Sequence, residues 1–392
     1  MNYLVAVNKL HLDLPGGAHK IAWDVACNMR DEGHNVAILC TGDGIKADNE
    51  TCQGIQVVRY VQRAGINIAR KVENRIESAS EAARKYLGYC KWDIIHAHSP
   101  FPGLGALNAF SPDVRSIYTI HSPLVMEERI NWLSQGPAGW FKLVLGMGRL
   151  RKLESEIYNR FSVIQSLSNF TRTQVNRLYG VGEKIQVIPF WNSYNTGRQY
   201  QKSDARKKMG WPGKTPVLFS LRRLTSRMGL ADAITAAGNL AKTHDFKLVL
   251  AGDGPLREKL QRQAVKAGVQ NKVIFTGRIS DEEVAIVYQA ADLFLLPTRS
   301  LECFGIIILE AYSFGCPVLC SDCGAIPELV KPISPAFIFP AGNVDILTNK
   351  LADFLDGKLT APLPQQLTEY VEKNYCRDTL FPLWRDMILG NS

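Results

Sequence analysis

The chain of 392 residues is 46% hydrophobic and 21% charged, and its formal net charge is +9. This length exceeds the size at which one core usually keeps growing, so we expect a soluble protein of two domains. We expect neither a membrane span nor a signal peptide, and the nine scattered cysteines favour reduced thiols in the cytoplasm over a disulfide framework. The basic balance fits phosphate ligands, anionic lipid head groups or nucleic acid without choosing among them.

Short apolar runs alternate with longer amphipathic stretches in the first half of the chain. Strands are expected at residues 4–7, 36–39, 57–60, 94–97, 116–120, 163–165 and 185–188. Residues 17–31 and 66–89 have helical patterns. This alternation is typical of a parallel sheet covered on both faces, and ligands bind such sheets beyond the carboxyl ends of the strands. The loops that follow the strands are therefore the places to search for a site.

Two adjacent glycines, Gly16 and Gly17, follow the first expected strand and precede a helix. They would let a ligand or a second domain approach the backbone closely, and the start of the helix favours an anion. An ordinary loop is the alternative. No Gly-x-Gly-x-x-Gly follows this strand, so a dinucleotide fingerprint is not supported.

Histidines stand at the ends of two expected strands. His96 and His98 are two residues apart and would share one face of their strand, as half of a metal site requires. No third ligand stands at a convincing spacing, which favours a structural or substrate-contacting role. His121 follows the next strand, where its imidazole is a candidate donor to a sugar hydroxyl or a phosphate.

Residues 137–162 mix basic, apolar and aromatic side chains at helical spacing. This mixture is typical of a helix that lies on a membrane surface. An amphipathic helix that closes over the sheet with a solvated basic face explains the pattern equally well. Peripheral contact with the inner face of a membrane is therefore a hypothesis at this point.

The apolar pattern lapses between residues 189 and 216, and we place the domain boundary there, after residue 195. A second alternating series follows. Its strands are expected at residues 217–221, 247–251, 273–276, 291–296, 317–321 and 336–339. The expected fold class is α/β, with two doubly wound, Rossmann-like domains in tandem and a binding cleft between them.

Arg222, Arg223 and Arg227 cluster at the carboxyl end of the first strand of the second domain. Arginine at such a place can chelate diphosphate oxygens with a forked geometry that lysine lacks. A solvated basic turn is the alternative. Gly252 lies in a second tight loop after a strand, in the run Ala-Gly-Asp-Gly-Pro, which is a weak signal alone.

Glu302 and Glu310 are two carboxylates separated by seven mostly apolar residues. A helix is expected over residues 306–314, with Gly315 in the left-handed position that ends it. The two glutamate backbones would lie roughly 10 Å apart, too far to share one proton or one metal ion. The spacing suits two contacts to one elongated ligand, with the helix N-terminus near Gly305 offering amides to an anion. A core helix that merely contains two glutamates is the alternative.

Cys316, Cys320 and Cys323 have the Cys-x3-Cys-x2-Cys spacing of enzymes that bind an iron–sulfur cluster. A buried strand is expected between the first two cysteines, which would hold them roughly 13 Å apart at ~3.3 Å per residue. That separation is too large for one cluster, so we expect none here.

Taken together, the chain resembles the retaining glycosyltransferases of the two-Rossmann-domain (GT-B) type, in the large group called family 4. The resemblance covers the whole chain and rests on the order of its motifs and on their placement in carboxyl-end loops. These motifs are Pro15-Gly16-Gly17, His98, His121, Arg223 with Arg227, the glycine loop at 251–255, Phe275-Thr276-Gly277-Arg278, Glu302-x7-Glu310 and Gly315-Cys316-Pro317-Val318.

The resemblance implies a role for each site residue. Arg223 and a second cation, for which Arg227 is the candidate, would hold the diphosphate of the donor. Glu310 would accept from the ribose hydroxyls, Glu302 from hydroxyls of the transferred sugar, and His121 would face that sugar. Further donor contacts would come from Gly16, Gly17, Gly252, Phe304, Gly305 and Ile306, and from Arg278 and Ile279 near the base.

Enzymes of this group keep the anomeric configuration without a carboxylate nucleophile, and the leaving diphosphate is thought to help deprotonate the acceptor. Catalysis in that scheme consists mostly of charge stabilisation and positioning. The sequence contains no Asp-x-Asp, which agrees with a donor site that uses no metal and no cofactor beyond the nucleotide sugar.

Two segments depart from the family pattern. Met228 stands where a lysine is expected, so Arg227, one position earlier, would have to supply the charge. The usual Pro-Asn-Gly-Val-Asp at the end of the first domain is replaced by Pro-Phe-Trp-Asn-Ser at residues 189–193. Residues 371–392 would form the helix that crosses back onto the first domain.

The sequence thus predicts a metal-independent glycosyltransferase with an acceptor domain at residues 1–195 and a donor domain at residues 196–370. It would move a sugar from a nucleotide sugar to a hydroxyl of a glycan or lipid-linked glycan in the cytoplasm, as in polysaccharide biosynthesis. We expect no nucleic acid among its partners. The alternative, which Met228 keeps open, is a catalytically inactive GT-B partner or a nucleotide-sugar-binding subunit.

Overall fold

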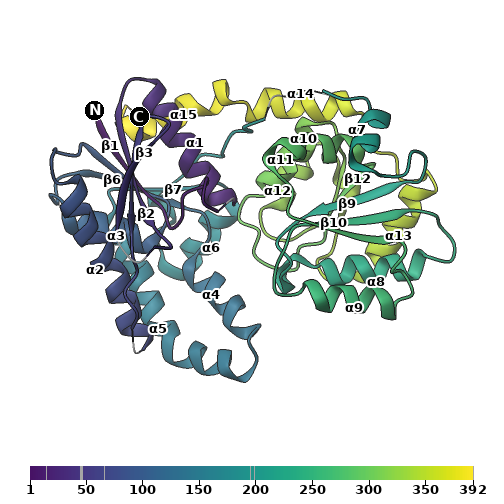
Figure 1. Cartoon of the computed structure of the whole chain (residues 1–392), viewed down its shortest axis with the longest axis horizontal. Coiled ribbons are helices and arrows are strands. Elements are labelled where there is room, and N and C mark those ends of the chain that lie inside the picture. Colours follow the sequence, from purple (N-terminus) through teal and green to yellow (C-terminus); the bar gives the residue numbers. More distant parts are fainter. Residues whose placement is uncertain (15, 45–46, 66, 195, 198, 392) are drawn as a thin grey trace. The chain divides into compact units, whose positions relative to one another are not determined.

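The computed structural model describes residues 1–14, 16–44, 47–65, 67–194, 196–197 and 199–391. The chain forms two compact units, of which unit 1 consists of Met1–Phe190 and Leu380–Ser392, and unit 2 of Trp191–Thr379. Each unit contains one largely parallel sheet with helices on both faces (Figure 1). The expected pair of α/β domains is confirmed. Within the described ranges, no helix has the length and apolar character needed to cross a bilayer.

Unit 1 is built on an eight-stranded sheet in the order β3-β4-β2-β1-β5-β6-β7-β8. Its strands are β1 (Asn2–Ala6), β2 (Asn35–Thr41), β3 (Asp48–Cys52), β4 (Ile55–Tyr60), β5 (Ile94–Ala97), β6 (Arg115–Ile120), β7 (Val163–Ser166) and β8 (Ile185–Val187). Its helices are α1 (Gly17–Asp31), α2 (Ile68–Leu87), α3 (Pro100–Ala109), α4 (Leu124–Leu133), α5 (Pro137–Arg160), α6 (Asn169–Tyr179) and the 3-10 turn η1 (Gly182–Lys184). The central strands are buried along most of their length because helices cover both faces.

Strand β3 was not expected from the sequence. Its residues, Asp-Asn-Glu-Thr-Cys, are polar and almost all exposed, so no apolar alternation marks them. It pairs antiparallel with β4 at the edge of the sheet through a two-residue turn in which Gln53 and Gly54 both have positive φ. Such a turn matches the twist of a hairpin, and Gln53-Gly54 was the available signal.

Unit 2 is built on a six-stranded sheet in the order β11-β10-β9-β12-β13-β14, with every neighbouring pair parallel. Its strands are β9 (Val217–Leu221), β10 (Lys247–Ala251), β11 (Val273–Gly277), β12 (Leu293–Leu296), β13 (Val318–Ser321) and β14 (Ile338–Phe339). Its helices are α7 (Lys202–Met209), α8 (Leu230–Leu240), α9 (Arg257–Lys266), α10 (Asp281–Ala290), α11 (Ile306–Ser313), α12 (Ile326–Val330), α13 (Val344–Leu355) and α14 (Pro364–Tyr375), with 3-10 turns η2 (Ser226–Met228) and η3 (Pro335–Phe337). Helices α8 and α9 cover one face of this sheet, and α10 and α11 cover the other (Figure 1).

All the strands expected from the sequence are present, with ends that differ by no more than two residues. The expected helix over 306–314 is α11, and Gly315, with φ +69°, donates its N–H to the carbonyl of Tyr312 in the left-handed position that ends it. Pro15 of the glycine motif, residue 66 at the expected start of a helix and residue 195 at the expected boundary lie outside the described residues.

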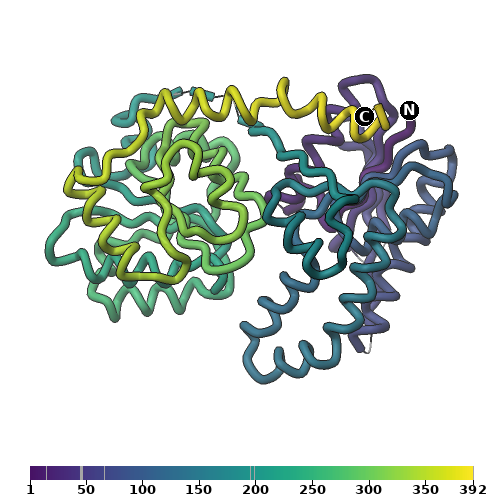
Figure 2. The backbone as a smooth tube through the Cα atoms, turned by 180° about the vertical axis from the view of Figure 1, so that it is seen from behind, coloured from purple at the N-terminus to yellow at the C-terminus, as the bar shows by residue number. Residues whose placement is uncertain are grey.

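The C-terminal segment is divided between the two units. Helix α14 belongs to unit 2 and ends where Cys376 adopts an extended conformation, and helix α15 (Arg377–Leu389) then follows, with its residues from Leu380 onward in unit 1. The indole Nε1 of Trp384 donates to the carbonyl of Pro189 at 2.8 Å, and the Arg115 guanidinium donates to two carbonyls at the end of α15. The end of α15 and the start of β1 lie close together in unit 1 (Figure 2).

Candidate active site

Four loops meet at the carboxyl end of the unit 2 sheet, after β9, β10, β12 and β13. Glycines allow this close approach. A Cβ at Gly252, where φ is +111°, would lie 2.1 Å from the carbonyl oxygen of Arg222. A Cβ at Gly324, where φ is +64°, would lie 2.1 Å from the carbonyl oxygen of Glu302. Only glycine therefore fits at these two positions, which let the loop after β10 pack on the Arg222 loop and the loop after β13 pack on the Glu302 loop.

Glu302 forms an ion pair with Arg222 in this assembly of loops. The distance between Nη2 of Arg222 and Oε2 of Glu302 is 2.5 Å, and the two side chains are 9% and 15% exposed. The same guanidinium contacts the sulfur of Met228, with Nη2 at 2.9 Å. Met228 is therefore a buried packing partner of Arg222. The position at which a lysine was expected thus belongs to the hydrophobic core.

Arg223 and Arg227, the two arginines chosen from the sequence, have different environments. The Arg223 side chain is exposed, and no described residue forms a hydrogen bond or ion pair with it. Arg227 donates from Nη1 to the carbonyl of Leu301 at 2.9 Å, next to Glu302. Leu301 has a φ of +55°, a conformation that bulky side chains rarely adopt, so the backbone before Glu302 is strained. The pairing of Glu302 with Arg222, the first arginine of this run, was not predicted from the sequence.

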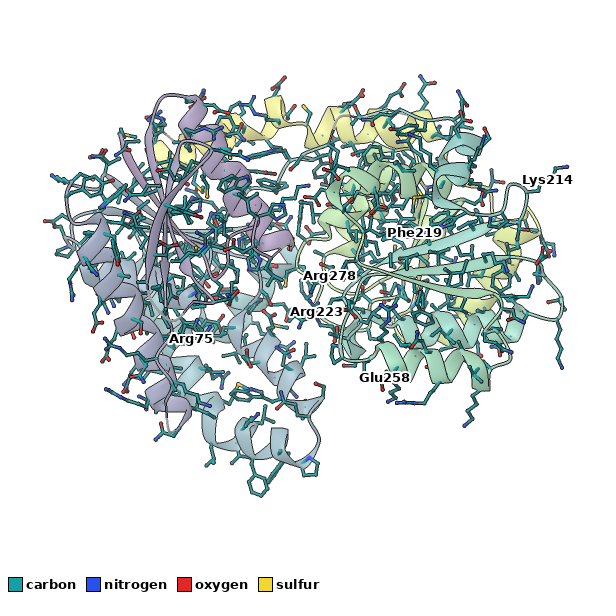
Figure 3. All side chains as sticks on the ribbon, viewed as in Figure 1. Arg75, Lys214, Phe219, Arg223, Glu258 and Arg278 are labelled. Carbon is teal, nitrogen blue, oxygen red and sulfur yellow. The ribbon has the colours of Figure 1, made fainter. Side chains whose placement is uncertain are left out.

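The other residues that were predicted to contact the donor lie in neighbouring loops. Gly252 donates its N–H to the carbonyl of Gly277 at 2.6 Å, which ties the loop after β10 to the loop that carries Arg278 and Ile279. Arg278 is exposed, and Figure 3 shows it at the same end of unit 2 as Arg223.

Helix α11 contributes both an N-terminus and a carboxylate. Gly305 precedes it with φ +92°, and the first amides of a helix have no acceptor within the helix. Phe304 is buried, whereas Ile306 is partly exposed. Glu310 is partly exposed on the second turn of α11. The pKa of Tyr288 is raised well above its usual value, mainly by burial of Tyr288 and further by the nearby carboxylate of Glu310.

In unit 1, the glycine loop and His121 follow β1 and β6, as expected. Helix α1 starts at Gly17, and both Gly16 and Gly17 are exposed. Nε2 of His121 lies 2.9 Å from Nδ1 of His98, and the two rings are stacked. The His98–His121 hydrogen bond fixes one nitrogen of His121 and leaves Nδ1 for other partners.

His96 belongs to the core instead. Its Nδ1 lies 2.6 Å from the Tyr3 hydroxyl and its Nε2 lies 2.7 Å from Oγ1 of Thr119, in full burial. Burial lowers the pKa of His96 and of His121 to about 3, and lowers that of His98 well below its usual value. All three imidazoles are therefore neutral at pH 7. No group of three potential metal ligands occurs in the part of the chain that the structure describes.

The cysteine spacing does not make a cluster site. Strand β13 lies between Cys316 and Cys323 and contains Cys320, and all three residues are buried and form no disulfide within the described chain. Burial raises the pKa of Cys320 far above its usual range, which favours the protonated thiol.

Two family models match the chain. The model described as "Glycosyltransferase Family 4" matches residues 15–190, and the model described as "Glycosyl transferases group 1" matches residues 201–374. Together they span most of both units. The chain therefore belongs to the group 1, family 4 glycosyltransferases.

Curated relatives and solved structures agree with this family. A GDP-mannose-dependent alpha-(1-6)-phosphatidylinositol monomannoside mannosyltransferase of Mycolicibacterium smegmatis is 31% identical over 227 residues, which are 55% of this chain and 58% of that protein. The match thus spans less than two thirds of that relative. A sucrose-phosphate synthase from Thermosynechococcus elongatus superposes with a TM-score of 0.79 at 18% identity, covering 99% of each chain. The Anabaena HepE protein, solved with UDP and glucose, superposes with a TM-score of 0.74 at 19% identity over 100% of each chain. At these identities the two structures are evidence for the GT-B fold.

Proposed function

We propose that this glycosyltransferase moves a sugar, with retention of configuration, from a nucleoside diphosphate donor to a hydroxyl of a glycan or lipid-linked acceptor. The observation that carries the proposal is the largely buried Arg222–Glu302 ion pair at the strand ends of unit 2, next to the exposed Arg223. It orients a carboxylate and places cationic charge within one set of loops. Among relatives, the Mycolicibacterium smegmatis enzyme is described as GDP-mannose-dependent, and the Anabaena protein was solved with UDP-glucose.

Each donor contact has a physical reason. No described residue donates to Oε1 of Glu302, so this oxygen can accept from a sugar hydroxyl while Oε2 stays on Arg222. Arg223 and Arg278 supply guanidinium groups for the diphosphate and the base end of the donor. The amides at the start of α11 add favourable partial charge for the diphosphate. Glu310, farther along α11, accepts from the ribose.

The reaction then needs little covalent chemistry from the protein. The diphosphate leaves on the face that the acceptor hydroxyl attacks, and its oxygens take the hydroxyl proton. Fixed positive charge around the diphosphate stabilises this developing charge, which is usually the largest contribution to catalysis in such sites. The neutral His121 contributes a hydrogen bond to the sugar rather than a charge. In this proposal the donor site uses neither a metal ion nor a further cofactor.

An exposed apolar cluster supports the proposal that the protein binds peripherally to the inner face of a membrane. Helices α4 and α5 form a hairpin of unit 1 (Figure 1), and five large apolar residues near its turn are at least 49% exposed. They are Leu133, Trp140, Phe141, Val144 and Leu145. Exposed basic side chains follow on the same helix, including Lys142, Arg151 and Lys152. Aromatic, aliphatic and basic residues together favour an interface with anionic lipids.

A panel of UDP-, GDP- and ADP-sugars without acceptor tests the catalytic proposal. We expect slow release of the sugar to water from one of them, and loss of that activity in Glu302→Gln and in Arg223→Ala. Glu258→Gln and Arg262→Ala are matched controls, because both residues are exposed on α9 (Figure 3 labels Glu258). Unchanged turnover in Glu302→Gln and Arg223→Ala would refute the site.

The second candidate, a binding subunit without catalysis, is favoured only by Met228, which leaves the diphosphate one cation short. It predicts that the chain binds one nucleotide sugar and hydrolyses none of them. Calorimetry on the same donor panel separates the two functions.

A further inference from the structure

Unit 1 contains a pocket of about 590 Å³ whose lining residues include none of those assigned above to the donor. It lies at the carboxyl ends of β1, β2 and β4, which is where open parallel sheets bind ligands. Asn8 follows β1, Thr41 ends β2 and Gln62 follows β4, and Arg75 reaches the pocket from α2. This end of the sheet also carries His121, which follows β6.

Arg75 is the unusual residue of this pocket. Its guanidinium carbon lies 3.9 Å from the centre of the buried Phe101 ring, which fixes one face of the group. Its Nε is buried without a hydrogen bond, and no carboxylate oxygen of the described chain lies within 4.0 Å of its nitrogens. Burial is the largest influence on Arg75 and lowers its pKa, whereas the charges of Tyr60 and Glu128 act in the opposite direction. Arg75 is thus a partly buried arginine that lines a pocket with its Nε buried and unpaired, an arrangement that favours an anion.

The other groups of the pocket extend this requirement. Lys9 adds a second cation, although it is paired with the exposed carboxylate of Asp43, which a stronger anion could displace. Burial is also the main cause that lowers the pKa of His19, so its imidazole is neutral at pH 7. The side-chain oxygen of Asn8 is buried without a donor. The pocket therefore combines a place for an anion with an acceptor for a hydroxyl.

We propose that this pocket holds the phosphate ester of the acceptor, with Arg75 and Lys9 on the phosphate and Oδ1 of Asn8 on a neighbouring hydroxyl. The proposal rests on the proposed function and names its acceptor as a polyol or sugar that carries a phosphate. The phosphate can belong to a phospholipid head group or to a soluble phosphate monoester, since both present the same oxygens. A guanidinium binds such oxygens in a two-pronged geometry.

A structural role for Arg75 alone would leave these observations unexplained. Stacking on Phe101 uses the face of the guanidinium and satisfies none of its N–H groups. An arginine kept only for packing would be expected to donate to a nearby carbonyl, as Arg84 on the same helix does to the carbonyl of Asn108.

The test is binding of sn-glycerol 3-phosphate to the full chain, followed by hydrogen–deuterium exchange. Glycerol is the neutral control. We expect protection of peptides that contain Asn8 and Arg75. We expect Arg75→Gln to weaken the affinity by at least about tenfold, since a charge-assisted hydrogen bond is lost. Arg70→Gln is the matched control, because Arg70 is exposed on α2 and paired with Glu73. Arg75→Lys keeps the charge and should keep part of the affinity, which guards against a misfolded Arg75→Gln.

Two further arms identify the source of the phosphate. Vesicles of phosphatidylcholine with phosphatidylinositol, compared with phosphatidylcholine alone, report a lipid head group if they protect the same peptides. Protection by sn-glycerol 3-phosphate but not by these vesicles identifies a soluble ester. Equal binding of glycerol and sn-glycerol 3-phosphate, or protection that Arg75→Gln does not change, would overturn the proposal. Because these readouts need no turnover, failure here leaves donor hydrolysis untouched, and an inactive enzyme leaves this binding test intact.

Discussion

Arg222 and Glu302 form a largely buried ion pair, with 2.5 Å between Nη2 and Oε2, whereas the adjacent Arg223 is exposed and unpaired by any described residue. One arginine thus orients the carboxylate that we assign to the sugar, and the next presents its charge to solvent. Neighbours in sequence have separable roles, because successive residues after a strand point in different directions.

Replacing the two arginines should separate stability from activity. Arg222→Gln leaves the Glu302 carboxylate buried without its partner, and we expect a loss of about 3 kcal/mol in the free energy of unfolding. Arg223→Gln should change stability by less than about 0.5 kcal/mol and still abolish donor hydrolysis. Urea unfolding and the hydrolysis assay on the same preparations measure both. Equal destabilisation by the two substitutions would contradict the assigned roles.

Gly324→Ala should disturb the Glu302 loop directly. The added Cβ would meet the carbonyl oxygen of Glu302 and would force a left-handed conformation on alanine, so we expect destabilisation of at least about 1 kcal/mol and a large loss of transfer. Gly213→Ala is the matched control, since a Cβ there meets nothing within 4 Å and φ is not in the left-handed region. Thermal unfolding and transfer assays check the pair. A fully active Gly324→Ala would show that the two loops do not need to meet.

The three neutral histidines, His96, His98 and His121, predict a stability that depends on pH. The pKa of His96 and of His121 is lowered to about 3 from an unfolded value near 6.5, and burial lowers the pKa of His98 well below its usual value. Below about pH 6.5 the unfolded chain therefore binds protons that the folded chain does not. The free energy of unfolding should fall as the pH falls, by about 1.4 kcal/mol per pH unit for each histidine, and should be fully retained above about pH 6.5.

Urea unfolding between about pH 7.5 and about pH 5.5 measures this slope. His96→Gln keeps an amide for Tyr3 and Thr119 and should remove about one histidine's share of it. A free energy of unfolding that is constant over this range would mean that the imidazoles are solvated or charged in the folded protein.

The exposed hairpin cluster predicts reversible binding to anionic vesicles. We expect pelleting with vesicles of phosphatidylglycerol and phosphatidylcholine that weakens at high salt, because screening shortens the reach of the basic residues. Leu145→Ser should weaken binding by about tenfold, since one leucine no longer enters the interface. Val265→Ser on α9 is the control, because Val265 is equally apolar and 62% exposed but lies in unit 2. Equal effects of the two substitutions would place the membrane contact elsewhere.

Much of the fold could be predicted from the sequence because parallel strands buried on both faces leave continuous apolar runs. Residues 247–251 and 94–97 were identified with the bounds of β10 and β5 for that reason. Strand β3 could not be found this way, since it is an edge strand whose residues are polar and exposed and which pairs only with β4. The end of α14 at Cys376 was missed because residues 371–392 continue in a helical pattern across it.

Individual residues of the candidate site could be predicted only where the end of a strand or the start of a helix determines their location. Glu302, Glu310, Gly305 and Arg278 lie in the expected loops or helix, and this follows from strand ends alone. Which of three arginines faces Glu302 depends on the conformation of the loops after β9 and β12, two neighbouring strands that are far apart in sequence. The pairing of His98 with His121 likewise needs β5 beside β6, which only the sheet order reveals.

Release of sugar from a nucleotide-sugar panel by the wild-type chain and by Glu302→Gln is the most direct test of the central claim. We predict that one donor is hydrolysed without acceptor and transferred faster with a lipid-linked or phosphorylated acceptor. We predict that Glu302→Gln does neither while its circular dichroism spectrum stays close to wild type, although loss of the ion pair with Arg222 lowers its free energy of unfolding. A wild-type chain that binds a nucleotide sugar yet releases no sugar under any condition, or a fully active Glu302→Gln, would contradict it.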